Sequence, residues 1–146
     1  MPHERVYIAA PFFNDRQLEI VEHIKSVLSS NNILYFSPKD ESMFKQGDNP
    51  IDILNLNVEA IVDSDYIIVV TDGKDTGTIW EAGYAFGKGI PILYLWVDRR
   101  EGQKFNIMLG ASGNVVNSFR ELDAACEDLS YATRLTNDFR VDINYE

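Results

Sequence analysis

Runs of apolar residues alternate with amphipathic segments along this chain. Short apolar runs with little polar interruption predict buried β-strands at residues 5–11, 33–37, 66–71 and 91–97. Apolar residues at three- and four-residue spacing predict helices at 14–32, 50–63 and 78–89. Weaker patterns predict a fifth strand near Val115 and Val116, a helix at about 120–135 and an irregular end at 139–146.

This alternation is typical of an α/β fold. Strands separated by helices pair in parallel through right-handed crossovers, so we predict a doubly wound, five-stranded parallel sheet with helices on both faces. The expected strand order is 2-1-3-4-5, as in flavodoxin-like and Rossmann-like folds. Ligands of such sheets bind where the strand order reverses, which directs attention to the loops at 11–17 and 72–77. The polar segment at 38–50 is a further candidate binding loop.

The composition fits one globular domain over residues 1–146, with 45% apolar residues for its core. Thirteen Lys and Arg against 23 Asp and Glu give a net charge of −10, which opposes binding to nucleic-acid polymers or anionic membranes. The single cysteine, Cys126, excludes an internal disulfide, and two histidines leave no cluster with metal-ligand spacing. Without a leader-like start or a long apolar run, a soluble cytoplasmic protein is expected.

The loop after the first predicted strand lacks the common nucleotide-binding signatures. It reads PFFNDRQ, without the glycines that let a backbone approach a pyrophosphate, and no P-loop signature occurs in the chain. A phospho-acceptor receiver domain would share the strand order and place an aspartate where Asp72 stands. It would also need a pair of acids after strand one, where the chain has Ala9 and Ala10, so we disfavour it.

The two loops instead offer carboxylates and aromatic rings, which suit a flat, uncharged ring as ligand. The acids are Asp72, Asp75 and Glu81, and the rings belong to Tyr7, Phe12 and Phe13. Two carboxyl groups about 5 Å apart are what retaining glycosyl transfer requires. One attacks the anomeric carbon and the other handles a proton.

Purely structural roles stay open for several of these residues. Glu81 follows Thr78 at the spacing of a capping box, in which the glutamate only bonds the backbone at a helix start. Asp75 would serve equally as an N-cap of a helix beginning near Thr76 or Thr78. Tyr7 and the two phenylalanines would also fit a core.

The rest of the helix predicted at 78–89 is expected to face inward. Trp80 and Tyr84 are more often core residues than a ligand platform. Gly83 and Gly87, four residues apart, predict close packing of this helix against the sheet.

Three short segments keep a common order along the chain, reading YIAAPFFNDRQ at 7–17, DTGTIWEAGYA at 75–85 and NIM at 106–108. Together they resemble the nucleoside 2-deoxyribosyltransferases, and the resemblance runs from Arg5 to about Val116. The family's D-x-G-x-x-x-E-x-G-Y-A block places its nucleophilic glutamate where Glu81 stands. The resemblance therefore favours a catalytic Glu81 over the capping box.

The resemblance implies transfer of 2-deoxyribose between purine or pyrimidine bases, with retained configuration, through a covalent deoxyribosyl-enzyme ester. Glu81 would attack C1′ and Tyr7 would orient it. Asp75 would contact the base and handle its proton, and Phe12 would lie against the base. Further substrate-binding candidates are Phe13 and Asp72. No metal or cofactor is called for, because loss of the 2′-hydroxyl eases positive charge at C1′.

The resemblance also implies a homo-oligomer with shared active sites, commonly a hexamer built from dimers. Asn106 and Met108 match a segment that, in the family, reaches into the neighbouring subunit and binds the 5′-hydroxyl. Asn57 stands where many members carry a second base-contacting aspartate, so we take it as substrate-binding and expect a different base preference. The chain ends in Tyr145 and Glu146, whereas family members often end near an aromatic residue whose carboxylate helps the site.

Two other functions stay open. A hydrolase of the same superfamily would cleave a deoxynucleoside 5′-monophosphate, but it would need a phosphate cradle after strand one, where Arg16 is the lone cation. A non-catalytic nucleoside-sensing module would not need Glu81. We favour the transferase, with deoxynucleosides and free nucleobases as its small-molecule partners.

Overall fold

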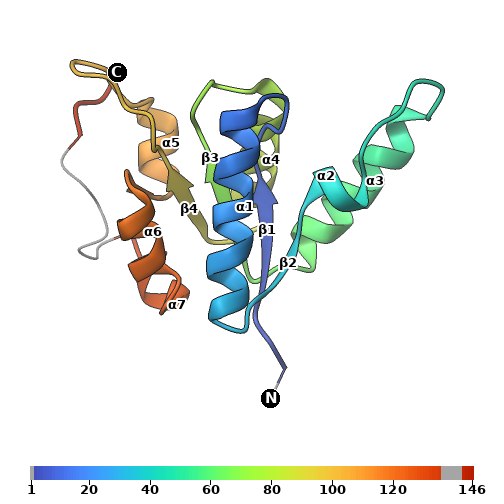
Figure 1. The fold of residues 1–146 in the computed structure, drawn as a ribbon, viewed down its shortest axis with the longest axis horizontal. Helices are drawn as coiled ribbons and strands as arrows, with labels where there is room; N and C mark the ends of the chain where they lie inside the picture. The colour runs from blue at the N-terminus through green and yellow to red at the C-terminus, as the bar shows by residue number, and fades with distance from the viewer. Residues whose placement is uncertain (1, 136–142) are drawn as a thin grey trace.

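A five-stranded parallel sheet forms the centre of the computed structural model, which describes residues 2–135 and 143–146 (Figure 1). The strands are β1 (Arg5–Ala9), β2 (Leu34–Phe36), β3 (Tyr66–Val70), β4 (Ile92–Leu95) and β5 (Asn114–Val116). Their order is β2-β1-β3-β4-β5, which confirms the predicted doubly wound arrangement. The order reverses between β1 and β3, where Tyr7 pairs with Ile67.

Helices cover both faces of the sheet, and α1 and α4 lie on opposite sides of β1 in Figure 1. The helices are α1 (Asp15–Ser30), α2 (Pro38–Glu41), α3 (Pro50–Val62), α4 (Thr76–Gly87), α5 (Ile107–Ser112), α6 (Phe119–Ala125) and α7 (Leu129–Ala132). None of these helices within residues 2–135 and 143–146 combines the length and apolar character needed to cross a bilayer.

Alternate residues of each strand face opposite sides of the sheet. In β1, Val6 and Ile8 pack with α1, α6 and α7, whereas Tyr7 and Ala9 pack with α3 and α4. Because both faces are buried, the central strands are apolar without alternation, as the sequence pattern indicated.

Capping side chains determine where two of the predicted helices begin. Asn14 accepts a hydrogen bond of 2.9 Å from the backbone N–H of Gln17 and begins α1. Asn49 caps α3, whose first residue is Pro50. Both predicted helix starts are therefore confirmed.

The structure departs from the predicted elements in the long loop and toward the C-terminus. The loop expected at 38–50 begins with α2, and α5 was not predicted. The helix expected at 120–135 is broken into α6 and α7, because Asp128 accepts a hydrogen bond from Tyr131 N and begins a new helix. Residues 139–142 of the expected irregular end lie outside the described residues, and Tyr145 forms a β-bridge with Phe105.

The sequence predicted that the aromatic residues and glycines of α4 face inward, and the structure differs. Trp80 is 51% exposed and stacks on Tyr84 with ring centroids 5.5 Å apart. Gly83 and Gly87 are exposed, and a Cβ on either would meet no atom within 4 Å. The residues of α4 that enter the core beside the sheet are Ala82 and Ala85. The expected glycine packing is therefore wrong, and the small alanines give the close approach.

Gly113, just before β5, is a glycine that the packing requires. A Cβ there would lie 2.8 Å from the carbonyl oxygen of Ile92 and 2.8 Å from the ring of Tyr94. We expect Gly113→Ala to lower the free energy of unfolding by about 2 kcal/mol, because the added methyl group would force the backbone at Ile92 to shift. Gly83→Ala, in open space on α4, should raise it by up to about 1 kcal/mol. Urea unfolding measures both variants, and equal stabilities would contradict the expected clash.

Candidate active site

A cavity of about 460 Å³ opens beyond the carboxyl ends of β1 and β2. Residues after β1 and from α2, α3 and α4 form its walls, and we call it the first cavity. Its lining comprises Ala10, Phe12, Phe13, Pro38, Ser42, Met43, Phe44, Ile53, Asn57, Asp75, Gly77, Thr78 and Glu81. Most of the residues predicted for the site therefore meet here, although they come from distant parts of the sequence.

Glu81 and Tyr7 form a buried polar contact at this cavity. Tyr7 lies in the middle of β1, is fully buried and stacks on Phe36 of β2 with ring centroids 5.4 Å apart. Its hydroxyl donates a hydrogen bond to Oε2 of Glu81 on α4. The central strand thus positions one carboxylate oxygen and leaves Oε1 available for a ligand.

Burial makes Glu81 an unusual carboxyl group. Its pKa rises from 4.5 to about 7, chiefly because burial penalises the charged form. The hydrogen bond from Tyr7 lowers the pKa, and the negative charge of Asp75 raises it. The pKa of the Tyr7 hydroxyl is itself raised by burial and by Glu81, so Tyr7 stays protonated as a donor. A strongly perturbed carboxyl group in a crevice is typical of a functional site.

Asp75 begins α4 and borders the same cavity. Its Oδ2 accepts hydrogen bonds from the backbone N–H and from the hydroxyl of Thr78, each 2.9 Å long. The N-cap expected as one alternative for Asp75 is therefore present. Because α4 begins at Thr76, Thr78 is not the cap and Glu81 lies beyond the capping-box position. The capping-box interpretation of Glu81 is wrong.

The aromatic candidates divide between the core and the cavity. Tyr7 belongs to the core cluster beneath α4 while its hydroxyl serves the cavity. Phe12 is partly buried and Phe13 is 73% exposed, with their ring centroids 5.1 Å apart. Both line the cavity, so an exposed apolar wall is available to a flat ring.

The opposite wall contains residues that sequence reasoning missed. Ser42 follows α2 and donates a hydrogen bond of 2.5 Å to Oδ1 of Asn57 on α3. Met43 and Phe44 come next in the chain and are 47% and 46% exposed. The segment at 38–50 is long and polar, which marked it as a candidate binding loop. No local pattern identified these particular side chains.

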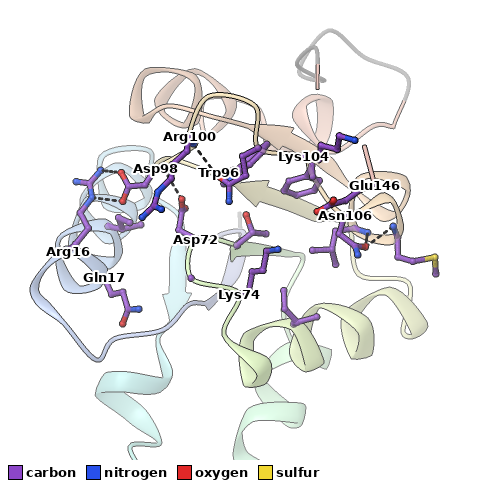
Figure 2. Close-up of a pocket in the computed structure, with 18 of the residues that line it drawn as sticks. Arg16, Gln17, Asp72, Lys74, Trp96, Asp98, Arg100, Lys104, Asn106 and Glu146 are labelled. Atoms are coloured by element: carbon purple, nitrogen blue, oxygen red, sulfur yellow. Dashed lines mark hydrogen bonds and ion pairs between the residues drawn. The ribbon is translucent and has the colours of Figure 1, made fainter. Parts of the chain in front are cut away.

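The remaining predicted residues line a second cavity, of about 670 Å³, at the carboxyl ends of β3 and β4 (Figure 2). These residues are Asp72, Asn106 and Met108. Asp72 accepts hydrogen bonds from the backbone N–H groups of Val97 and Asp98 at 3.0 and 2.7 Å. Burial raises the pKa of Asp72. Its carboxylate therefore holds the segment after β4, apart from the first cavity.

Asn106 and the C-terminal residues form one end of the second cavity, opposite Arg16 and Asp98 in Figure 2. Asn106 Oδ1 caps α5 by accepting from the backbone N–H groups of Met108 and Leu109. Ile107 N donates to the backbone oxygen of Glu146 at 2.8 Å, so the chain end lies against α5. Met108 is 75% exposed.

Positive charge lies in the second cavity and not in the first. No Lys, Arg or His occurs among the described residues that line the first cavity. The second is lined by Arg16, Lys74, Arg100 and Lys104. Arg16 bonds both carboxylate oxygens of Asp98, at 2.9 and 2.7 Å, and also Glu19 at 2.8 Å. Within residues 2–135 and 143–146 no group of His, Cys, Asp and Glu is arranged to hold a metal ion.

A perturbed carboxyl group at the switch point of a doubly wound sheet is typical of an α/β enzyme. A sequence model described as nucleoside 2-deoxyribosyltransferase matches residues 6–127, and this chain belongs to that family. A comparison with curated protein sequences finds no match.

Several solved structures share the fold. A 2-deoxyribosyltransferase from Bacillus psychrosaccharolyticus is 24% identical, with a TM-score of 0.71 over 95% of this chain and 98% of its own. A 2-deoxyribosyltransferase from Leishmania mexicana is 22% identical, with a TM-score of 0.63 over 86% and 98%. A CMP N-glycosidase from Clostridium botulinum is 19% identical, with a TM-score of 0.59 over 83% and 96%. Family and fold together support deoxyribosyltransferase or related N-glycosidase activity.

Because the pKa of Glu81 is raised in the fold, its ionisation should lower the free energy of unfolding as pH rises. The folded protein holds this proton up to about pH 7, whereas an unfolded chain releases it near 4.5. Stability from this group is therefore greatest at low pH and is lost as pH rises through this interval. We expect Glu81→Gln to raise the free energy of unfolding by on the order of 2 kcal/mol at about pH 8.

That gain should shrink toward about pH 5, because the wild-type carboxyl group is then protonated in the fold. Urea unfolding at both pH values measures it. Glu59→Gln, an exposed change on α3, serves as the matched control and should give little difference. A Glu81→Gln effect that is independent of pH would contradict the buried, perturbed carboxyl group.

Proposed function

We propose that this protein transfers 2-deoxyribose between nucleobases through a covalent ester on Glu81. The observation that carries the proposal is the buried Glu81 carboxyl group, held by Tyr7 of the central strand and bordered by Asp75. A binding module would gain nothing from a carboxyl group whose ionisation is disfavoured. A nucleophile gains reactivity, because burial penalises the carboxylate but not the neutral ester that it forms.

The reaction proceeds in two displacements at C1′. Oε1 of Glu81 forms a bond to C1′ while the glycosidic C1′–N bond breaks and its electron pair moves to the base. A proton from solvent reaches a ring nitrogen of the departing base through the Asp75 carboxylate. An incoming base then attacks C1′ and loses its proton to solvent through the Asp75 carboxylate, and Glu81 leaves as carboxylate. Two inversions give net retention.

Each carboxyl group has support suited to its role. Tyr7 is a positioning residue, since its hydroxyl holds Oε2 of Glu81 and leaves Oε1 to react. Asp75 is held through Oδ2 by Thr78, so Oδ1 is the oxygen that can exchange a proton with the base. Phe12 and Phe13 offer apolar surface against which a base can lie.

The charges favour an unphosphorylated nucleoside over a nucleotide. The described lining of the first cavity has no cation to receive a 5′-phosphate, and its acids would repel one. Arg16, the cation after β1, is engaged by Asp98 and Glu19. The nucleotide hydrolase suggested by the CMP N-glycosidase fold is therefore the less favoured alternative.

We assign the transferase to deoxynucleoside salvage in the cytoplasm.

We further propose that the active site is shared between subunits of a homo-oligomer, a hexamer built from dimers as the family resemblance implies. Exposed apolar side chains on α3 and α4 support an interface with a second copy, namely Ile51, Leu54, Trp80 and Phe86. Asn106 and Met108 lie outside the first cavity of their own chain. A neighbour's first cavity is where they would bind the sugar's 5′-hydroxyl.

The transferase is tested by incubating the protein with deoxyinosine and free adenine. We expect deoxyadenosine and hypoxanthine by chromatography, and with deoxyinosine alone a mass increase of one deoxyribosyl group on the protein. Glu81→Ala should lower the exchange rate at least about a thousandfold while the thermal transition persists, because the nucleophile is lost. Glu59→Ala, on the exposed side of α3, is the matched control and should keep the wild-type rate.

Other outcomes of this assay distinguish the alternatives. Near wild-type exchange by Glu81→Ala would overturn the proposed mechanism. Hypoxanthine release without deoxyadenosine would identify a hydrolase. Nucleoside binding with no turnover of several donor and acceptor pairs would identify a binding module.

Shared sites predict complementation between two inactive variants. Asn106→Asp keeps an oxygen to cap α5 but replaces the amide N–H groups by a second acceptor. We expect this variant and Glu81→Ala each to be inactive, and their mixture, after dissociation and reassembly, to recover roughly a quarter of wild-type activity through random pairing. Glu81→Ala mixed with Glu81→Gln should recover none. Full activity of Asn106→Asp alone, or a monomer by light scattering, would refute the shared site.

A further inference from the structure

The amide of Asn57 is held in one orientation at the wall of the first cavity. Ser42 Oγ lies 2.5 Å from Asn57 Oδ1 and 3.4 Å from the carbonyl oxygen of Pro38. A hydroxyl has a single proton, and the shorter contact is the stronger hydrogen bond. A distance of 2.5 Å suits O–H···O and is too short for N–H···O, so the amide oxygen and not the nitrogen faces Ser42.

This orientation determines which group Asn57 can present to a ligand. The oxygen is occupied by Ser42, and no described residue accepts a hydrogen bond from Nδ2. Asn57 lines the cavity together with Asp75 and Glu81. The side chain therefore offers the cavity N–H donors, where a carboxylate would offer only acceptors.

We propose that Asn57 Nδ2 donates a hydrogen bond to an exocyclic carbonyl oxygen of the base and so selects 6-oxopurines over 6-aminopurines. The proposal rests on the proposed function in one respect, that a nucleobase occupies the first cavity. It names the class of base that this chain's site prefers, hypoxanthine or guanine over adenine.

The chemistry of the purine edge supports this preference. In hypoxanthine the O6 carbonyl and N7 lie side by side and both accept hydrogen bonds. Asn57 would donate to O6, and N7 on the same edge is left free to take up the proton that passes through Asp75. In adenine the amino group at C6 is a donor, so it would face the Asn57 N–H groups and leave both unpaired. An unpaired polar group in a ligand site costs roughly a tenfold loss of affinity.

The test compares binding of free hypoxanthine and free adenine by isothermal titration calorimetry. The wild-type protein should bind hypoxanthine roughly tenfold more tightly. Asn57→Asp keeps an acceptor for Ser42 and presents a second oxygen, so it should bind adenine more tightly than hypoxanthine. Ser42→Ala frees the amide to turn either way and should bring the two affinities closer. Asn55→Asp, an exposed change on α3 outside the cavity lining, is the matched control and should keep the wild-type ratio.

The binding measurements test the inference without depending on catalysis. A preference for hypoxanthine that Asn57→Asp inverts and Asn55→Asp does not supports it. Equal binding of the two bases, a preference for adenine, no binding of either, or an unchanged ratio in Asn57→Asp overturns it. Selective binding of hypoxanthine without base exchange would overturn the proposed transferase and leave the base selection standing. Exchange of deoxyinosine and deoxyadenosine with equal kcat/KM would support the transferase and overturn the base selection.

Discussion

A carboxyl group buried below the protein surface is the feature on which the candidate site depends. Glu81 is held there by the hydroxyl of Tyr7, a core residue of the central strand. The hydrogen bond needs β1 and α4 to be neighbours, and the strand order provides this because α4 follows β3, the partner of β1. Burial raises the energy of the carboxylate and Tyr7 moderates it, leaving a pKa of about 7.

One acidic side chain, that of Asp75, serves the fold and the candidate site at once. Asp75 caps α4 with the same carboxylate that borders the first cavity, so the helix start fixes the position of this cavity residue. Asp72 instead ties the segment after β4 through two backbone N–H groups. These two aspartates thus act as a helix cap beside the first cavity and as a loop anchor beside the second, where Arg16, Lys74, Arg100 and Lys104 also lie.

The two cavities give the domain two distinct polar environments at the carboxyl edge of the sheet. The first combines apolar walls with acids and the oriented Asn57 amide, which suits an uncharged base. The second combines four cations with acids and the chain end. Asn106 caps α5 at the second cavity, apart from the first cavity of its own chain.

The sequence by itself determined the strands and most of the helices, because burial and capping patterns depend on neighbours a few residues away. The strand order followed from the alternation of strands and helices, and the grouping of Tyr7, Asp75 and Glu81 followed from the resemblance to the family. Spacing alone left Glu81 between a cap and a nucleophile, since that choice turns on whether Asp75 or Thr78 is the N-cap of α4. The outward turn of Trp80 and the Ser42 bond to Asn57 were decided by tertiary structure. Such contacts join separate elements, and their geometry follows from sheet register and helix packing that no local pattern encodes.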